Sequence, residues 1–313
     1  MTTRPEEGLA VVVGCDGSWE SVEAVDVAVE EARRRALPLV VLTVEDGRGA
    51  GLHDLRDWSR ASAEGALWAG AIGCRALERV GDRVPVTALT ATEVDSPQLD
   101  GLAGGTALLV VGRHGSGGLG AFASGSTSEQ LVRRLRCPVL VAGPRPGAGA
   151  VHRVGGPHPV VVVGVDDEPS AAVVLRVAVE AAQLRGWALT VVHAVPRTDT
   201  ELHLLARGVW ERHGDLLLAQ RSPDHSLARV VVEVERPVPA LLSHAGPHDL
   251  VVVGTHGEGR LAGLISGSVA RGVLDRMPCD VLVVPPHVVA PDAVPVPRPD
   301  QVAAAAVEPD RRH

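Results

Sequence analysis

The chain has 313 residues, of which 45% are hydrophobic, so it can build two domains of roughly 150 residues and is not globally disordered. Its formal net charge is −8, and every basic side chain other than histidine is an arginine. An acidic chain with one phenylalanine and no tyrosine lacks the basic patches and stacking platforms of general nucleic-acid or anionic-membrane binders.

The four cysteines form no CxxC pair and no tight cluster, which favours a reducing compartment and indicates no metal site. We expect Cys15, Cys137 and Cys279 to be buried packing residues. The segment MTTRPEEGLA lacks the apolar core of a signal peptide, and no apolar run approaches the roughly 20 residues of a membrane span. The expected location is the cytoplasm, with no membrane partner.

The first half of the chain alternates short apolar runs with stretches whose apolar residues recur at helical spacing. The apolar runs are continuous and end at turn residues, as in buried parallel strands. In chain order, the predicted elements are strand Leu9–Gly14, helix Ser21–Arg35, strand Leu39–Val44, helix Ser59–Val80, strand Val84–Thr90, helix Ser96–Ala103, strand Ala107–Val111, helix Ser126–Arg136 and strand Pro138–Ala142.

The second half repeats the first, because VVVGCDGSWESVEAVDVAVEEA returns as VVVGVDDEPSAAVVLRVAVEAA. Asp166 follows Asp16 by 150 positions (166 − 16), and Gly254 follows Gly112 by 142 (254 − 112). These offsets indicate a duplicated domain with a net deletion, and not a short solenoid repeat. The strands predicted for the second copy are Val160–Val165, Ala188–Ala194, Ala228–Val234, Leu250–Gly254 and Asp280–Val284.

Alternating strands and helices predict two tandem α/β domains, each a parallel sheet with helices on both faces. We expect the domains at residues 8–143 and 158–286. Residues 144–157, rich in proline and glycine, are expected to form a linker, and the proline-rich residues 287–313 a disordered tail.

Glycine and serine concentrate after the fourth predicted strand of the first copy, in VVGRHGSGGLGAFASGSTS. Ligands of open parallel sheets bind beyond the carboxyl ends of the strands, where the winding direction reverses. Glycines such as Gly112 and Gly115 let the backbone approach a ligand, and hydroxyls beside the free amides of the following helix favour a phosphate. The residues that open this helix are Gly125, Ser126, Thr127 and Ser128.

The spacing Gly-x2-Gly-x9-Gly-Ser begins at Gly112 and again at Gly254. It is not a Walker A loop, which requires a lysine, nor a dinucleotide fingerprint, whose glycines follow the first strand. With VGCDGS and CPVLVAG, the repeated spacing closely resembles the universal stress protein family in a tandem two-domain form. The resemblance implies five-stranded flavodoxin-like (Rossmann-like) sheets and ATP binding.

Carried over by position, the resemblance places Asp16 beside the nucleotide, within reach of a phosphate-bound Mg²⁺, and Val44 against the adenine. It places Gly112 and Gly115 along the ribose and phosphates. The phosphates themselves would be held by Gly125, Ser126, Thr127 and Ser128.

The second copy departs from this pattern. Its corresponding residues are Asp166, Ala194, Gly254, Gly257, Gly267, Ser268 and Val269. The apolar Val269 stands where the first copy has a threonine, and the carboxylates of Asp167 and Glu168 disfavour an anion. We therefore expect the second site to bind more weakly than the first.

Three functions stay open. The first is an ATP-binding regulatory protein of stress response or dormancy, with no catalytic residue and no dedicated metal ligand assigned. The second is a slow ATPase on the same pocket, although neither a general base nor an arginine finger stands out. The third is a nucleotide-free interaction module with vestigial loops. The expected partners are an adenine nucleotide and a second subunit, as a homodimer or as an intramolecular pseudo-dimer.

Overall fold

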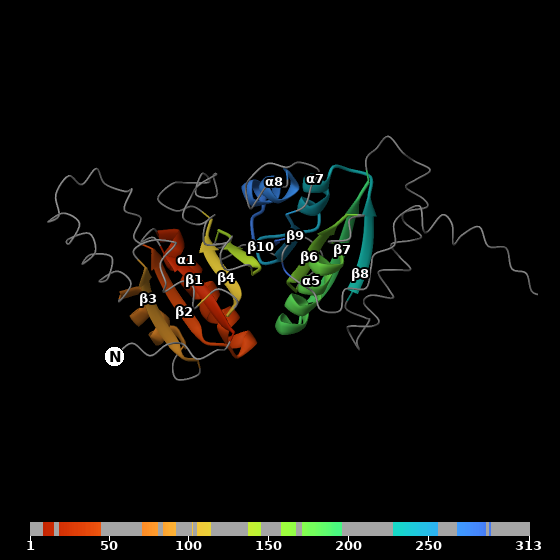
Figure 1. Cartoon of the computed structure of the whole chain (residues 1–313). Helices are drawn as coiled ribbons and strands as arrows, with labels where there is room; N and C mark the ends of the chain where they lie inside the picture. The colour runs from red at the N-terminus through yellow and green to blue at the C-terminus, as the bar shows by residue number, and fades with distance from the viewer. Residues whose placement is uncertain are drawn as a thin grey trace, which may run out of the picture. The chain divides into compact units, whose positions relative to one another are not determined.

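A computed structural model describes residues 9–15, 19–44, 71–80, 84–91, 102, 105–113, 137–144, 158–166, 171–195, 228–255, 268–285 and 288. They belong to two compact units, and the continuous first stretch of unit 1 ends at Pro144 (Figure 1). Within these ranges, no helix is both long and apolar enough to cross a membrane.

The first unit holds five parallel strands in the spatial order β3-β2-β1-β4-β5. They are β1 (Ala10–Cys15), β2 (Leu39–Val44), β3 (Val86–Ala91), β4 (Thr106–Gly112) and β5 (Val139–Ala142). The chain winds outward from β1 to β3 and then returns to the other side of β1 for β4. The winding direction therefore reverses between β1 and β4, where ligands of such sheets bind.

Two described helices pack together in the first unit. Helix α1 (Trp19–Arg35) buries an apolar stripe with helical spacing, formed by Ala24, Val25, Ala28, Val29 and Ala32. Residues 71–80 form a second helix. It lies beside α1, since the guanidinium of Arg75 is 3.1 Å from the carboxylate of Asp26 in α1. This helix comes close to β3, since a Cβ built at Gly73 would lie 3.3 Å from the Ala88 methyl.

The second unit has the same topology as the first, with five parallel strands in the order β10-β9-β6-β7-β8. They are β6 (Val160–Val165), β7 (Ala188–Ala194), β8 (Ala228–Glu233), β9 (Leu250–Gly254) and β10 (Asp280–Val284). Its described helices are α5 (Ala171–Arg185), α7 (Pro237–Leu242) and α8 (Ser268–Arg276). The winding direction reverses between β6 and β9.

Helices cover both faces of this second sheet. A Cβ built at Gly164 would lie 3.1 Å from Leu241 of α7, and one at Gly254 would lie 3.0 Å from Val174 of α5. The parallel register of β6 and β9 points Gly164 and Gly254 to opposite faces. Helices α7 and α8 share a face, because they pack against each other.

The two copies end their first helix in the same way, with a residue in the left-handed region. In α1 this residue is Ala36, with φ 52°, and in α5 it is Gly186, with φ 63°. Both ends satisfy their last carbonyls with matching backbone hydrogen bonds. The donors and acceptors are Ala36 N to Arg33 O (3.2 Å), Leu37 N to Ala32 O (3.0 Å), Gly186 N to Gln183 O (3.2 Å) and Trp187 N to Ala182 O (3.0 Å).

A buried carboxylate holds the amino-terminal end of the second sheet. Asp249, only 3% exposed, directly precedes β9. Its Oδ1 accepts a hydrogen bond from the Val160 amide at 2.8 Å, and its Oδ2 accepts one from the Gly246 amide at 2.6 Å. Asp249 therefore joins the start of β6 to the turn before β9, at the edge opposite the strand ends that carry the predicted site.

The predicted fold class is confirmed, and all ten predicted strands are present. Strands β2, β6, β7, β9 and β10 have the predicted bounds, and the others differ by at most two residues at either end. Helix 71–80 lies within the predicted Ser59–Val80. The predicted helix Ser126–Arg136 lies outside the described residues, as does Ser96–Ala103 except for Leu102, which is in a turn. The short helix α7 was not predicted.

Candidate functional site

The predicted site residues that the structure describes lie at carboxyl ends of strands. In the first unit, Val44 ends β2 and Gly112 ends β4, next to β1. In the second unit, Ala194 ends β7, Gly254 ends β9 and Asp166 follows β6. Parallel strands bring these ends to the same edge of their own sheet, where the winding reverses.

Several predicted residues fall outside the described ranges. For Val44 the backbone in β2 is described and the side chain is not. The residues that remain predictions are Asp16, Gly115, Gly125, Ser126, Thr127, Ser128, Gly257 and Gly267. The site of the first unit therefore rests on sequence, and the geometry below is that of the second unit.

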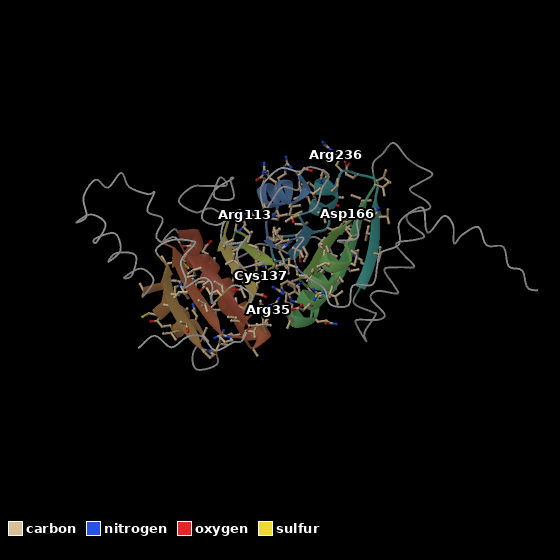
Figure 2. All side chains as sticks on the ribbon, in the orientation of Figure 1. Arg35, Arg113, Cys137, Asp166 and Arg236 are labelled. Carbon is tan, nitrogen blue, oxygen red and sulfur yellow. The ribbon has the colours of Figure 1, made fainter. Side chains whose placement is uncertain are left out.

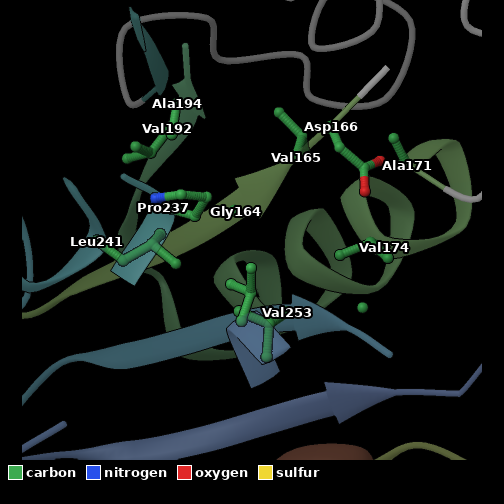
Figure 3. Close-up of a pocket in the computed structure, with 12 residues that line it drawn as sticks. Gly164, Val165, Asp166, Ala171, Val174, Val192, Ala194, Pro237, Leu241 and Val253 are labelled. Carbon is green, nitrogen blue, oxygen red and sulfur yellow. The ribbon is translucent and has the colours of Figure 1, made fainter. Parts of the chain in front are cut away.

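A pocket opens at the carboxyl edge of the second sheet, above β6, β7 and β9 (Figure 3). It is lined by Gly164, Val165, Asp166, Ala171, Val174, Val192, Ala194, Pro237, Leu241, Val253, Gly254 and Val269. Four of these residues were predicted by carrying the family resemblance over to the second copy: Asp166, Ala194, Gly254 and Val269. Of the other predicted residues, Ser268 is exposed as the first residue of α8 and does not line the described pocket.

Glycines allow the helices to approach the sheet at this pocket. A methyl group at Gly164 would meet Leu241 at 3.1 Å, and one at Gly254 would meet Val174 at 3.0 Å. Both separations are shorter than ordinary carbon–carbon contacts of 3.5–4.0 Å. The helices α5 and α7 therefore lie close to the sheet on either face, and larger residues at the two glycines would intrude into the pocket wall.

The electrostatic character of the pocket comes from one side chain and from helix ends. Asp166 is exposed and is the only charged residue among the described lining residues (Figures 2 and 3). Helix α5 begins at Ala171 and α8 at Ser268, so the amino-terminal ends of both helices lie beside the pocket. The rest of the lining is apolar, which suits a ligand with a flat apolar part.

A buried histidine joins the two strands under the pocket. The Nδ1 atom of His193, in β7, lies 3.1 Å from the carbonyl oxygen of Val165, in β6. Because a carbonyl oxygen only accepts, Nδ1 carries the proton and donates it. His193 is 5% exposed, so it fixes the strand ends and does not face solvent.

Sequence reasoning missed most of the apolar lining residues. Gly164 had a signal, because VVVGV repeats the VVVGC that contains Gly14. Pro237 and Leu241 had none, because α7 is a short helix whose sequence PVPALL lacks a helical pattern of useful length. Val174 lies in α5 and Val253 in β9, and only the packing places them at the pocket.

Three of the four cysteines are buried. Cys15, Cys137 and Cys279 are at most 4% exposed, which confirms the predicted packing role. Burial raises the pKa of Cys137 to about 12, against weaker lowering by backbone hydrogen bonds at Leu109 and Cys137 itself, so its thiol is protonated at neutral pH (Figure 2). Among the described residues, no group of three His, Cys, Asp or Glu side chains could hold a metal ion.

The order 3-2-1-4-5 of the strands within each unit defines a tandem α/β protein with doubly wound, Rossmann-like sheets. The sequence profile described as the Universal stress protein family matches residues 10–143 and 159–285. A universal stress protein of Mycobacterium tuberculosis is 32% identical over an alignment of 302 residues, which covers 90% of this chain and 98% of that protein. Another from the same organism is 30% identical over 318 residues, covering 89% of this chain and 95% of that protein.

A solved structure agrees in fold. The crystal structure of a universal stress protein from Archaeoglobus fulgidus superimposes with a TM-score of 0.63, at 18% identity, over 88% of this chain and 95% of that chain. At this identity the likeness concerns the fold alone. The two matched segments and the relatives that span nearly the whole chain show that the chain belongs to the universal stress protein family.

Proposed function

We propose that the protein binds an adenine nucleotide at the carboxyl edge of its sheets and acts as a regulatory protein in stress response. The observation that supports this most is the second-unit pocket. Asp166, Ala194, Gly254 and Val269 were chosen by carrying the family resemblance over to the second copy of the repeat, and they line one pocket at the switch point of the sheet.

The chemistry of the described lining fits the base and the sugar of a nucleotide. Apolar side chains from both faces, such as Val174 and Leu241, form a surface against which a flat base can pack. The Asp166 carboxylate can accept a hydrogen bond from a ribose hydroxyl, as acidic residues do in other doubly wound folds.

ATP, with Mg²⁺, is proposed for the first unit. Its segment Gly125–Ser128 supplies glycine and hydroxyl residues at a predicted helix start, where backbone amides bind phosphates. Asp16 would face the phosphate-bound Mg²⁺. In this proposal the bound nucleotide orders the glycine loop and shifts the protein toward a form that self-associates or binds a partner protein in the cytoplasm.

The test is mass spectrometry of small molecules released from the purified full chain. The first-copy variant combines Gly125→Ala with Ser126→Ala, and the matched second-copy variant combines Gly267→Ala with Ser268→Ala. We expect the unaltered protein to carry an adenine nucleotide, the first-copy variant to lose most of it, and the second-copy variant to retain most of it.

Three results would count against the proposal. Equal nucleotide loads in all three proteins would refute the assignment of the site. No load, together with no rise in melting temperature on adding ATP, would favour an interaction module, because a native-state ligand at 100 times its Kd stabilises by about 2.7 kcal/mol. Release of ADP above background from bound ATP would favour a slow ATPase.

A further inference from the structure

Strand β8 forms one edge of the second sheet. Its neighbour on one side is β7, and none of the described strands lies on its other side (Figure 1). The edge is apolar, because β8 has the sequence ARVVVE and its three valines, Val230, Val231 and Val232, are only half-buried. An open apolar edge offers backbone N–H and C=O groups to a further strand.

The hydrogen bonds to β7 determine which residues of β8 face the open edge. The carbonyl oxygen of Glu233 accepts a hydrogen bond from the Val195 amide at 2.8 Å, so the backbone groups of Glu233 point toward β7. Successive residues of a strand direct their N–H and C=O groups to alternate sides. Val231 therefore also faces β7 with its backbone, whereas the backbone groups of Val230 and Val232 point to the open edge.

The residues of β8 are complementary to the same strand in a second molecule. In an antiparallel pair centred on Val231, Val230 lies opposite Val232 of the partner subunit. These are the residues with outward backbone groups, so they can exchange the hydrogen bonds of an antiparallel ladder. The same register places Arg229 opposite Glu233 of the partner subunit at both ends of the pair. Opposite charges at facing positions stabilise a pair of strands.

The structure holds both charged groups at this edge. Arg229 and Glu233 point to the same face of the sheet, because they are four residues apart in one strand. The Nε atom of Arg229 donates to Thr190 Oγ1 at 3.1 Å, and Oε1 of Glu233 lies 2.8 Å from Nε2 of His244. Arg229 is exposed and the Glu233 side chain is 36% exposed, so the outer atoms of both groups can reach a partner.

The edge strand of the first sheet has a different charge pattern. This strand, β3, has the sequence VTALTA, and it pairs with β2 as β8 pairs with β7. When the two sheets are aligned through these registers, Thr87 stands in the place of Arg229. Ala91 stands in the place of Glu233. Strand β3 therefore lacks both charges that make β8 complementary to itself.

We propose that β8 is an interface through which two molecules of this protein associate, as an antiparallel strand pair centred on Val231. The arrangement is symmetric, because it uses the same edge of both subunits. A pair of six-residue strands is small beside the roughly 1,600 Å² of a standard interface, so the association is weak and depends on protein concentration. It needs no nucleotide and so goes beyond the proposed function.

Disulfide trapping of the full chain tests the register. The background is Cys74→Ser, because Cys74 is exposed and can form cross-links of its own. Facing Cα atoms of a non-hydrogen-bonded antiparallel pair are about 4.5 Å apart, a distance that a disulfide bridges. Val231 faces its own counterpart, so Val231→Cys should give a covalent dimer with oxidised glutathione. In the matched variant Val230→Cys the equivalent atoms are about 7–8 Å apart, so about tenfold less dimer should form.

Exchange of the charges tests their complementarity. Arg229→Glu brings two glutamates opposite each other, and Glu233→Arg brings two arginines opposite each other. Each variant alone should associate about tenfold more weakly than the unaltered protein in sedimentation equilibrium at low salt. An equal mixture of the two variants restores both opposite-charge pairs and should associate as the unaltered protein does. The control Thr87→Glu adds a carboxylate at the matching exposed position of β3 and should change nothing.

The opposite results would overturn the proposal. Equal or greater trapping of Val230→Cys would exclude this register, and no dimer from either cysteine variant would exclude the interface. If the mixture associates no better than its components, or if Thr87→Glu weakens association equally, charge complementarity at β8 is wrong. The double variant Arg229→Glu with Glu233→Arg keeps the net charge and should associate normally, which separates repulsion from misfolding. All samples lack added nucleotide, so a failure here leaves the proposed function standing.

Discussion

The repeated helix ends allow a pair of opposite substitutions to be compared within one chain. Ala36 and Gly186 hold the same left-handed position after α1 and α5, with φ values of 52° and 63°. Only glycine adopts this conformation without a steric penalty from its side chain. We predict that Ala36→Gly stabilises the protein and that Gly186→Ala destabilises it by a similar amount.

The magnitude follows from two opposing terms. The left-handed conformation costs an L-residue roughly 1–2 kcal/mol. The greater freedom of glycine in the unfolded chain returns about 0.4–1 kcal/mol of that difference. Ala36 is exposed, so its methyl contributes little burial, and a Cβ at Gly186 would meet nothing within 4 Å. The net change is therefore about 0.5–1 kcal/mol, positive for Ala36→Gly and negative for Gly186→Ala.

Urea unfolding of the full chain, followed by circular dichroism, measures both changes as shifts in midpoint at constant slope. Ala71→Gly is a suitable control, because Ala71 is also exposed but lies in a helix, where glycine costs about 1 kcal/mol. If Ala36→Gly lowers the free energy of unfolding as Ala71→Gly does, the left-handed conformation is not strained and the reasoning is wrong.

Three further predictions concern the pocket and the core. Gly254→Ala places a methyl group 3.0 Å from Val174. The free energy of unfolding should therefore fall by about 1–3 kcal/mol, and titration should show weaker adenosine binding to the second unit. Unchanged values of both quantities would contradict the close packing at Gly254. Asp249→Ala leaves two amides without their acceptor, so it should lower the free energy of unfolding, measured in urea, by about 2–4 kcal/mol. Asp249→Asn should have a stability between those of the unaltered protein and Asp249→Ala. A loss below about 0.5 kcal/mol for Asp249→Ala would contradict this account. At pH 8, iodoacetamide should label the exposed Cys74 in the native protein and leave Cys137 unlabelled. The reason is that the raised pKa of Cys137 keeps its thiol protonated until the pH approaches about 12. Mass spectrometry of digested peptides shows which cysteine is labelled, and labelling of native Cys137 would contradict the prediction.

The strands could be predicted from sequence because their signal is local. A run such as Val160–Val165 is continuous, apolar and bounded by turn residues, and β6 has those bounds. Helix α7 could not be predicted in this way, because six residues with two prolines carry no periodicity. Its position is decided by contact of Leu241 with the sheet at Gly164, which joins segments 77 positions apart (241 − 164).

The candidate site, like the fold, could be predicted from the sequence only in part. The family resemblance, carried over to the second copy by its alignment with the first, picked out Asp166, Ala194, Gly254 and Val269. It could not pick out the partners of these residues in the pocket wall. Val174 lies in a helix and Leu241 in another, and each reads in sequence as an ordinary buried apolar residue.

By itself, the sequence determined the tandem α/β organisation, the strand positions and the strand ends where a ligand is expected, since short-range hydrophobic patterns and an internal repeat specify them. Tertiary structure alone decided the strand order around β1 and β6, the face that each helix of the second unit covers, and the apolar residues that line its pocket. The physical reason is that these features arise from packing between segments far apart in the chain. Which faces meet, and which charges come together, depends on how the whole sheet buries its apolar surface.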